Sequence, residues 1–486
     1  MKKESFSLRR KARLLSAVAV GALLLSSCAQ DGFDEDERWS SSVKNTQLES
    51  PAVEDITIEA SADGAQTIIS WPVVEGAGGY ICSVLDVSDA ENPAAVDGIQ
   101  DSLIDRCTIA VTRAEDTNYK FVITTAGNDK FNNKQAETAT EVAFTTFTES
   151  YASIPAGADL AEWFANNTID GTGELCFDLE GGAEYYLSKD LDFYDKQVTL
   201  RSNNRTDHAK IKITADASFM TSTGLSFKYI DFDCSASTKP LIRLSATPDP
   251  SIQGATGSGD YYNIMQPITI NTCNVDNMRG TLYYDNKQKY CASVLLITNS
   301  VIHFTLDGTG EIYDQALISA YSGHINNFTV QNSTFYNTGS DEATYFVRYN
   351  NSGRCTRAGY TADYVNYRNC TLYNIAKSGQ MANYGGLAGQ ASSNYTVTNN
   401  IFVDCGGNEV ARRIVAGRVG SGVANFSNNT YMFDNDFTEN LAGYDNSGTD
   451  IKEDPGFANP AQGDFTISGA TQISRRTGDP RWIPAN

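Results

Sequence analysis

The sequence predicts an all-β protein: a small β-sandwich, then a right-handed parallel β-helix with an N-terminal capping helix. Two observations predict this fold class. Tyr (25), Phe (22) and Gly (39) are frequent while Met (6) is rare, a composition that favours strands over helix bundles. The second half of the chain also repeats one strand–Asn–strand unit about every 30 residues, which is typical of stacked coils.

The first residues have the order of a lipoprotein signal peptide, predicted over residues 1–27. A basic stretch, "MKKESFSLRRKAR", precedes an apolar run, "LLSAVAVGALLL", that is too short to span a bilayer. The run leads into "LSSC", which resembles a bacterial lipobox and implies that Cys28 is lipidated and becomes the mature N-terminus. The alternative is an ordinary signal peptide with a chance Cys.

Residues 28–50 are predicted to be an acidic and polar tether. The stretch "AQDGFDEDERW" directly after Cys28 resembles the surface-export signal of Bacteroidota lipoproteins. That resemblance implies a protein on the outer membrane, anchored by lipid and exposed at the cell surface. The plainer interpretation is a solvated linker, and both can hold.

Residues 51–148 are predicted to form the sandwich, because short alternating strands are separated by turn signals. "TIISWPVVEGAGGYICSVLD" contains Trp71 and Tyr80, and "NYKFVITTAGND" contains Tyr119. This arrangement resembles a fibronectin type III domain, in which an early Trp packs the core and a later Tyr forms a corner. The resemblance implies a spacer between the tether and the main body.

Residues 149–486 are predicted to form the β-helix. The stretch 155–167, "PAGADLAEWFANN", has Leu160, Trp163 and Phe164 on one helical face. A short amphipathic helix before a series of strands is expected to cap the exposed first coil.

The repeat unit places one Asn at each corner between two strands. Successive corners are 28, 33, 37, 30 and 29 residues apart, and the corner residues are Asn271, Asn299, Asn332, Asn369, Asn399 and Asn428. Asn tolerates positive φ, and its amide can bond the Asn of the next coil. The sequence therefore predicts a ladder of Asn side chains inside the stack, with bulky residues such as Phe335 three positions later. The stretch near Tyr229 is interpreted as an earlier copy without the Asn.

As a whole, the chain resembles Bacteroidota surface lipoproteins of unassigned function that join a fibronectin-like domain to a pectate-lyase-like β-helix. Such proteins are found with polysaccharide-utilisation systems, often for pectin. The resemblance implies contact with a glycan, and polysaccharide-uptake transporter components as partners. It does not imply catalysis.

A local excess of positive charge marks a candidate binding face for an acidic polysaccharide. The chain has a net charge of −22, which argues against nucleic acid as a partner, yet residues 341–420 contain eight basic and five acidic residues. Arg348 lies 16 residues after a corner Asn, and Arg412 and Arg413 lie 13 and 14 residues after another. We expect them on equivalent strands two coils apart, with Tyr349 and Tyr384 stacking on sugar rings.

Catalysis by a lyase is the second hypothesis for the same substrate. It requires a base, for which Arg348, Arg413 or Lys377 could serve, and cations such as Ca²⁺. Asp231 and Asp233 share one strand face and are the candidate calcium ligands, although paired Asp residues are more often plain surface. No pectate lyase, polygalacturonase, nucleotide-binding or zinc motif is found in the sequence.

The function predicted from sequence is non-catalytic capture of a pectin-like uronic-acid polysaccharide for uptake. A polysaccharide lyase is the alternative, and a structural or adhesive surface protein is the third hypothesis. No cofactor other than possible Ca²⁺ is expected. Nine cysteines remain after Cys28, and most lie within apolar alternation, which predicts buried free thiols, with one disulfide as the alternative.

Overall fold

The computed structural model describes residues 43–61, 65–89, 91–254 and 261–485. The predicted signal peptide, Cys28 and most of the predicted tether lie outside these ranges. The chain divides into two compact units between Thr148 and Glu149, and each unit has its own hydrophobic core.

The first unit is a β-sandwich of two antiparallel sheets. One sheet contains β1 (Thr57–Ala60), β2 (Gln66–Ser70) and β6 (Thr108–Thr112). The other contains β3 (Tyr80–Asp86), β4 (Ala94–Ala95), β5 (Ser102–Ile104), β7 (Asn118–Thr125) and β8 (Thr140–Thr145).

Aromatic side chains fill the space between these two sheets. Trp71 is buried and packs on Tyr80 and Phe121, with ring centroids 5.4 and 5.5 Å apart. The hydroxyl of buried Tyr119 accepts a hydrogen bond from the Ala114 N–H, a local corner contact at 3.0 Å. The likeness to fibronectin type III itself stays a prediction.

The tether ends earlier than its predicted boundary at residue 50. Leu48 is buried, its N–H donates to the Lys134 carbonyl, and Asn45 N–H donates to the Phe131 carbonyl. An apolar side chain and its backbone hydrogen bonds thus attach residues 43–50 to the sandwich.

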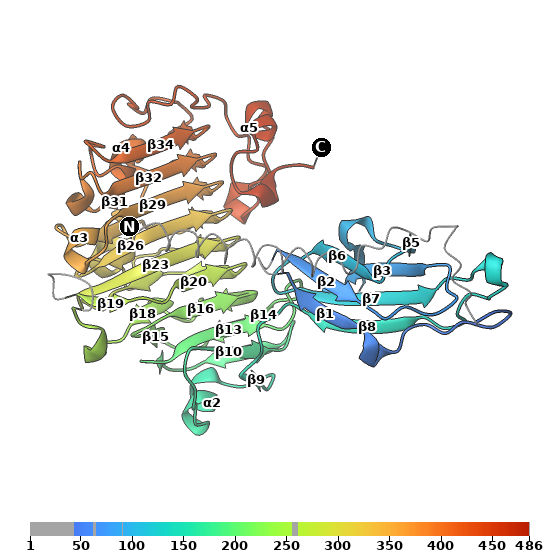
Figure 1. Ribbon diagram of the computed structural model, residues 1–486. Coiled ribbons are helices and arrows are strands. Elements are labelled where there is room, and N and C mark those ends of the chain that lie inside the picture. Colours follow the sequence, from blue (N-terminus) through green and yellow to red (C-terminus); the bar gives the residue numbers. More distant parts are fainter. Residues whose placement is uncertain (1–42, 62–64, 90, 255–260, 486) are drawn as a thin grey trace, which may run out of the picture. The chain divides into compact units, whose positions relative to one another are not determined.

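The second unit is the right-handed parallel β-helix that the sequence predicts, built from three parallel sheets (Figure 1). The long sheet consists of β9 (Ala152–Ile154), β10 (Glu174–Leu179), β13 (Gln197–Ser202), β16 (Leu225–Lys228), β20 (Ile268–Asn271), β23 (Tyr290–Thr298), β26 (His324–Gln331), β29 (Asp363–Arg368), β32 (Ser393–Thr398) and β34 (Val423–Ser427), with β19 (Tyr262–Ile264) beside β23.

The middle sheet consists of β11 (Glu184–Leu187), β14 (Ala209–Ile213), β17 (Ile230–Asp233), β21 (Asn274–Met278), β24 (Val301–Phe304), β27 (Thr334–Asn337), β30 (Thr371–Tyr373), β33 (Ile401–Val403) and β35 (Thr430–Met432). The short sheet consists of β12 (Leu191–Asp192), β15 (Phe219–Thr221), β18 (Ile242–Leu244), β22 (Tyr283–Tyr284), β25 (Ala316–Ala320), β28 (Tyr345–Tyr349) and β31 (Gln380–Asn383).

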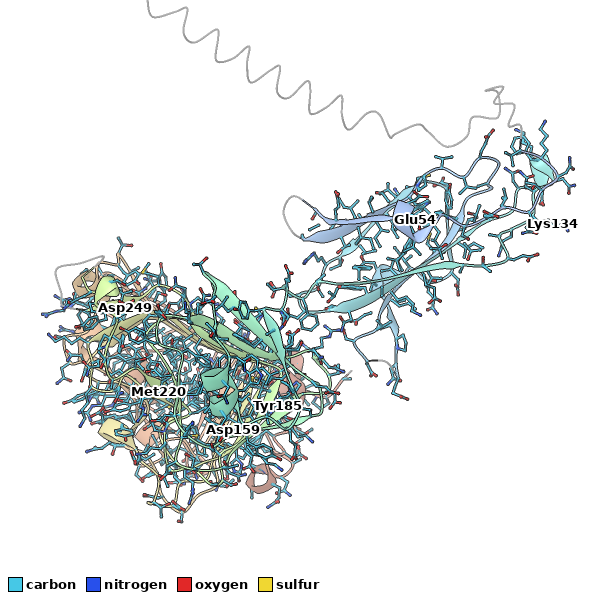
Figure 2. All side chains as sticks on the ribbon, turned by 90° about the horizontal axis from the view of Figure 1, so that it is seen from below. Glu54, Lys134, Asp159, Tyr185, Met220 and Asp249 are labelled. Atoms are coloured by element: carbon cyan, nitrogen blue, oxygen red, sulfur yellow. The ribbon has the colours of Figure 1, made fainter. Side chains whose placement is uncertain are left out.

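Helix α2 (Leu160–Asn166) caps the first coil, as predicted. The Asp159 carboxylate accepts the Glu162 N–H and so begins the helix. Leu160 is fully buried, and Phe164 contacts Phe177 with ring centroids 4.8 Å apart. Figure 2 shows Asp159 and this helix at the near end of the coil stack.

The corner between the long and middle sheets has the predicted left-handed backbone. The corner residues of successive coils have φ near +50°, and they are Tyr229, Thr272, Asn299, Asn332, Asn369, Asn399 and Asn428. Thr272 occupies the corner that the sequence analysis assigned to Asn271. Asn271 is instead the last residue of β20, because it pairs with Thr298 rather than with Asn299.

An outer ladder of amides joins several corner residues. Asn332 Nδ2 donates to Asn299 Oδ1 at 3.1 Å, Asn369 donates to Asn332 at 3.2 Å, and Asn428 donates to Asn399 at 3.1 Å. These amides are only half-buried or exposed, so the prediction that the ladder lies inside the stack is wrong. The side chain of a corner residue with positive φ points away from the interior of the coil, toward solvent.

A second, inner ladder lies one residue further along and is fully buried. Its members are small or polar, and they are Cys273, Ser300, Ser333, Cys370, Asn400 and Asn429. In several coils the inner side chain accepts a backbone N–H of the coil before it, as in Cys273 N to Ser300 Oγ at 3.1 Å and Cys370 N to Asn400 Oδ1 at 3.0 Å. This ladder satisfies N–H groups that the corner removes from the strand pattern.

The segment 454–483 lies along the outer face of the middle sheet and contains α5 (Ala470–Arg475). Phe465 packs on Tyr336 and Tyr373, with ring centroids 5.1 and 5.6 Å apart. The Trp482 indole donates to Thr334 Oγ1 at 2.7 Å. The segment therefore covers apolar strands that would otherwise face solvent.

The remaining helices are short: α3 (Cys355–Ala358) and α4 (Val410–Ile414). Within the described ranges, no helix is long and apolar enough to cross a membrane. The nine described cysteines are free thiols, and all but Cys107 are buried, which agrees with their predicted packing role.

Candidate functional site

The outer face of the short sheet carries a row of outward side chains, one from each coil. Strand register aligns Arg243, Tyr284, Ser319, Arg348 and Asn383 in this row. Their inward neighbours, such as Ile318 and Val347, are fully buried. Strand alternation thus separates a hydrophobic interior from a polar outer row.

Arg348 is the residue of this row with the clearest candidate role in binding. Its guanidinium carbon lies 4.1 Å from the ring centroid of Tyr321 and 4.9 Å from that of Tyr345. Its Nη1 donates to the Asp314 carbonyl at 2.7 Å, and its Nε has no partner. Among the described residues, no carboxylate pairs with Arg348. The side chain is half-buried, so the rings orient an arginine whose remaining donors have no counter-ion.

The other side chains of this row are either neutral or paired with an opposite charge. Arg243 pairs with Asp190, and the ring of Tyr284 stacks on that of Tyr313 at 3.9 Å. Burial raises the pKa of the Tyr313 hydroxyl to about 12, so this phenol stays neutral and donates to Glu311. Positive charge without a partner is therefore found at the Arg348 end of the row.

Tyr349 and Tyr384 do not line this surface. Both are buried, at 0% and 1% exposure, and their rings pack together in the interior with centroids 5.1 Å apart. The Tyr384 hydroxyl donates to the Ile414 carbonyl. The prediction that they stack on sugars is wrong, because strand alternation turns Tyr349 inward next to outward Arg348, and Tyr384, which directly follows β31, is buried against it.

Arg412 and Arg413 lie on α4 rather than on a strand. The helix contacts β31, which pairs with β28, so their predicted position two coils from Arg348 holds but their predicted strand does not. Both guanidinium groups bind the Glu409 carboxylate, with Arg413 Nη2 at 2.7 Å. Helical (i, i+3) and (i, i+4) spacing makes this pairing local, which weakens their case as ligands of an acidic glycan.

Lys377 is unsuited to act as a base. Its ammonium lies 2.8 Å from Asp434 and 3.2 Å from Asp404, and the hydrogen bond to Asp434 raises the pKa of Lys377 above its ordinary value. The amine is thus held protonated and cannot accept a proton. The expectation of a catalytic Lys377 is not supported by this geometry.

Asp231 and Asp233 lie on one outward face of β17, as predicted, but they are already occupied. Asp231 binds His208 Nδ1 at 2.8 Å and Asn274 Nδ2 at 2.7 Å. Asp233 accepts the Ser235 N–H at 3.0 Å. The part of the chain that the structure describes has no group of three His, Cys, Asp or Glu side chains arranged to hold a metal ion, so the calcium interpretation of this pair is not supported.

Sequence reasoning missed the two rings that frame Arg348. Tyr345 stands three residues earlier on β28, and Tyr321 follows β25 one coil below. Strands β25 and β28 pair with Ser319 opposite Arg348, and this register brings Tyr321 and Tyr345 to the same guanidinium group. Tyr345 is close to Arg348 in the stretch "TYFVRY", so the sequence could have indicated this contact. The contact with Tyr321 could be found only from the pairing of β25 with β28.

The fold places the chain in the class of right-handed parallel β-helix proteins. Three family models, each of a domain of unknown function, match in succession: DUF4992 at residues 1–187, DUF4957 at 183–338 and DUF5123 at 365–482. The first model therefore runs beyond the sandwich into the first coil. No curated protein matches the chain.

One solved structure with a detectable likeness is pectate lyase PelI from Erwinia chrysanthemi in complex with tetragalacturonic acid. It is 11% identical, the match covers 80% of this chain and 85% of that chain, and the TM-score is 0.14.

Proposed function

We propose that this protein captures an acidic, uronic-acid polysaccharide such as pectin through the outer face of the short sheet, and that it does so without cleaving it. The observation that carries the proposal is Arg348, held between Tyr321 and Tyr345 without a carboxylate partner among the described residues. A planar guanidinium suits a sugar carboxylate, and tyrosine rings suit the apolar faces of pyranoses.

The net negative charge of the chain provides a test of this proposal. A polyanion approaching a chain of net charge −22 is repelled at long range, and the local field of Arg348 favours contact within a Debye length of ~8 Å at physiological salt. We expect Arg348→Ala to weaken retention of polygalacturonate in affinity electrophoresis by about tenfold or more, the value of a charge-assisted pair.

The matched control is Arg412→Ala. Arg412 shares Glu409 with Arg413, so its removal leaves that carboxylate paired and no new charge exposed. We expect near-parental retention for this variant. Equal loss in both variants, or none in Arg348→Ala, would contradict the assignment of the site. Release of unsaturated ends from the polymer would show lyase activity and overturn the non-catalytic part of the proposal.

The proposal includes a lipid anchor at Cys28 that places the binding face at the outer membrane surface, near polysaccharide-uptake transporter components. Its support is the order of basic, apolar and "LSSC" segments in the sequence. We expect Cys28→Ala to move the protein from the detergent-extracted membrane fraction to the soluble fraction, measured by fractionation. Unchanged partition of the variant would rule out this anchor.

A further inference from the structure

Over its last five coils, the outer face of the long sheet carries almost no charged side chains. Figure 1 shows β23, β26, β29, β32 and β34 side by side across it. Most outward side chains of these strands carry hydroxyl or amide groups and only one is charged; they are Val294, Leu296, Thr298, Asn327, Thr329, Gln331, Tyr364, Asn366, Arg368, Asn394, Thr396, Thr398, Val423, Asn425 and Ser427. In a chain of net charge −22, this is a nearly neutral surface.

Tyr364 is the first outward residue of β29, the middle one of these five strands. It is 42% exposed, and strand register places Asn327 on one side of it and Asn394 on the other. No hydrogen bond ties its hydroxyl to any other described residue. An exposed aromatic ring between two amides presents an apolar platform with polar groups at both edges.

Hydrogen bonds hold the neighbouring amides in fixed orientations. Asn366 Nδ2 donates to Thr329 Oγ1 at 3.0 Å and to Asn327 Oδ1 at 3.2 Å, and Arg368 Nη2 donates to Asn366 Oδ1 at 3.3 Å. Asn394 Nδ2 donates to the Asp363 carbonyl at 3.2 Å. Within the described chain these contacts leave Asn327 Nδ2 and Asn394 Oδ1 without a partner, as a donor and an acceptor on either side of Tyr364.

We propose that this face, centred on Tyr364, binds a neutral, hydroxyl-rich polysaccharide. The ring would stack on the apolar face of one pyranose, while Asn327 and Asn394 would exchange hydrogen bonds with the hydroxyls of its neighbours. Because the rows continue across five coils, an extended chain can cross several of them. The near absence of charge favours a neutral ligand over a uronate polymer.

A second copy of this chain is a weaker candidate for the occupant. Of the large apolar side chains on these outward rows, Tyr364 and Val423 are exposed and Val294 and Leu296 are half-buried, while most other positions are amides and hydroxyls. Interfaces between identical subunits need a more apolar centre than this row provides. The proposed site is independent of Arg348, which belongs to the short sheet.

The test is affinity electrophoresis of the full chain in gels containing a neutral β-glucan, xyloglucan or arabinan. We expect retardation by at least one of these polymers, little changed by salt and reduced about tenfold in Tyr364→Ala, while Tyr364→Trp retains it. Tyr194→Ala is the matched control, because Tyr194 is 38% exposed on another part of the helix. Arg348→Ala should bind the neutral polymer normally.

Three results would overturn this inference, of which the first two concern retardation in the gels. The first is the absence of retardation by every neutral polymer in the panel, and the second is equal retardation of the parent and Tyr364→Ala. The third is a shift from dimer to monomer in Tyr364→Ala by light scattering without glycan binding, which would assign the face to self-association. If Arg348→Ala loses retention of polygalacturonate while Tyr364→Ala keeps it, the result concerns the site on the short sheet and does not test the site at Tyr364.

Discussion

Replacing Asn400 by Leu is expected to lower the free energy of unfolding of the β-helix by about 4 kcal/mol, since each orphaned buried polar group costs about 1–3 kcal/mol. The Asn400 amide is fully buried and serves three partners: it accepts the Cys370 N–H at 3.0 Å and donates to the Tyr367 carbonyl and to Asn429 Oδ1, each at 2.9 Å. Leu fills a similar volume but satisfies none of them. Urea unfolding of parent and variant measures the difference.

Asn369→Leu is the comparison that separates the two ladders. Asn369 is a corner residue whose half-buried amide donates to Asn332 at 3.2 Å. Water can replace this partner, so we expect a loss of about 1 kcal/mol, part of it from placing Leu at positive φ. If Asn369→Leu destabilised the protein as much as Asn400→Leu, the outer ladder would be as important to stability as the inner one.

Asp285 is expected to make the β-helix less stable as pH rises from about 4 to about 8. This carboxyl is fully buried, and burial raises its pKa to about 7, although N–H groups of Ser322, Gly323 and Lys287 bond its oxygens and partly offset this. The folded state therefore keeps a proton that the unfolded state releases near its ordinary pKa of 3.8. Between these two pKa values the unfolded state is ionised while the folded state must keep Asp285 protonated. Each rise in pH therefore favours the unfolded state and lowers the free energy of unfolding.

Asp285→Asn isolates this contribution. The neutral amide does not titrate, so the stability of the variant relative to the parent should improve by up to about 4 kcal/mol between pH 4 and pH 8, because each tenfold change in proton affinity on folding corresponds to ~1.4 kcal/mol. Urea unfolding at several pH values gives the comparison, in which the titrations of other groups cancel. A difference between variant and parent that is independent of pH would mean that Asp285 titrates normally in the fold.

The coil stack was predictable because its signal is repeated. Asn299, Asn332, Asn369, Asn399 and Asn428 each occupy the expected left-handed corner. The shift from Asn271 to Thr272 escaped prediction because Asn at the end of one strand and Asn at a corner look alike without the pairing of Asn271 with Thr298. The inner ladder was visible as the small or polar residue after each corner, but burial at that position depends on the turn of the backbone.

Of the candidate binding residues, the outward position of Arg348 was predictable, and the environment of the others was not. Whether a side chain faces outward depends on single-residue register, so Tyr349 next to Arg348 proved to be core. Whether a basic side chain is free to bind a ligand depends on its ion-pair partners. Glu409 precedes Arg412 by three residues, so this pair was visible in the sequence. Asp434 pairs with Lys377 from 57 residues later in the chain, and that pair was not visible. Long-range pairing of this kind leaves no trace in a single sequence.

The segment laid over the middle sheet sets an order of events during folding. Coils can dock one after another as the chain emerges, because each coil contacts only its neighbours. The outer faces of Ile401, Val403 and Met432 cannot be covered until Ile467 and the residues around it have followed them. A chain still being synthesised would therefore present an apolar strip until residues 454–483 emerge, and that stage is the one at which aggregation or holdase binding competes with folding.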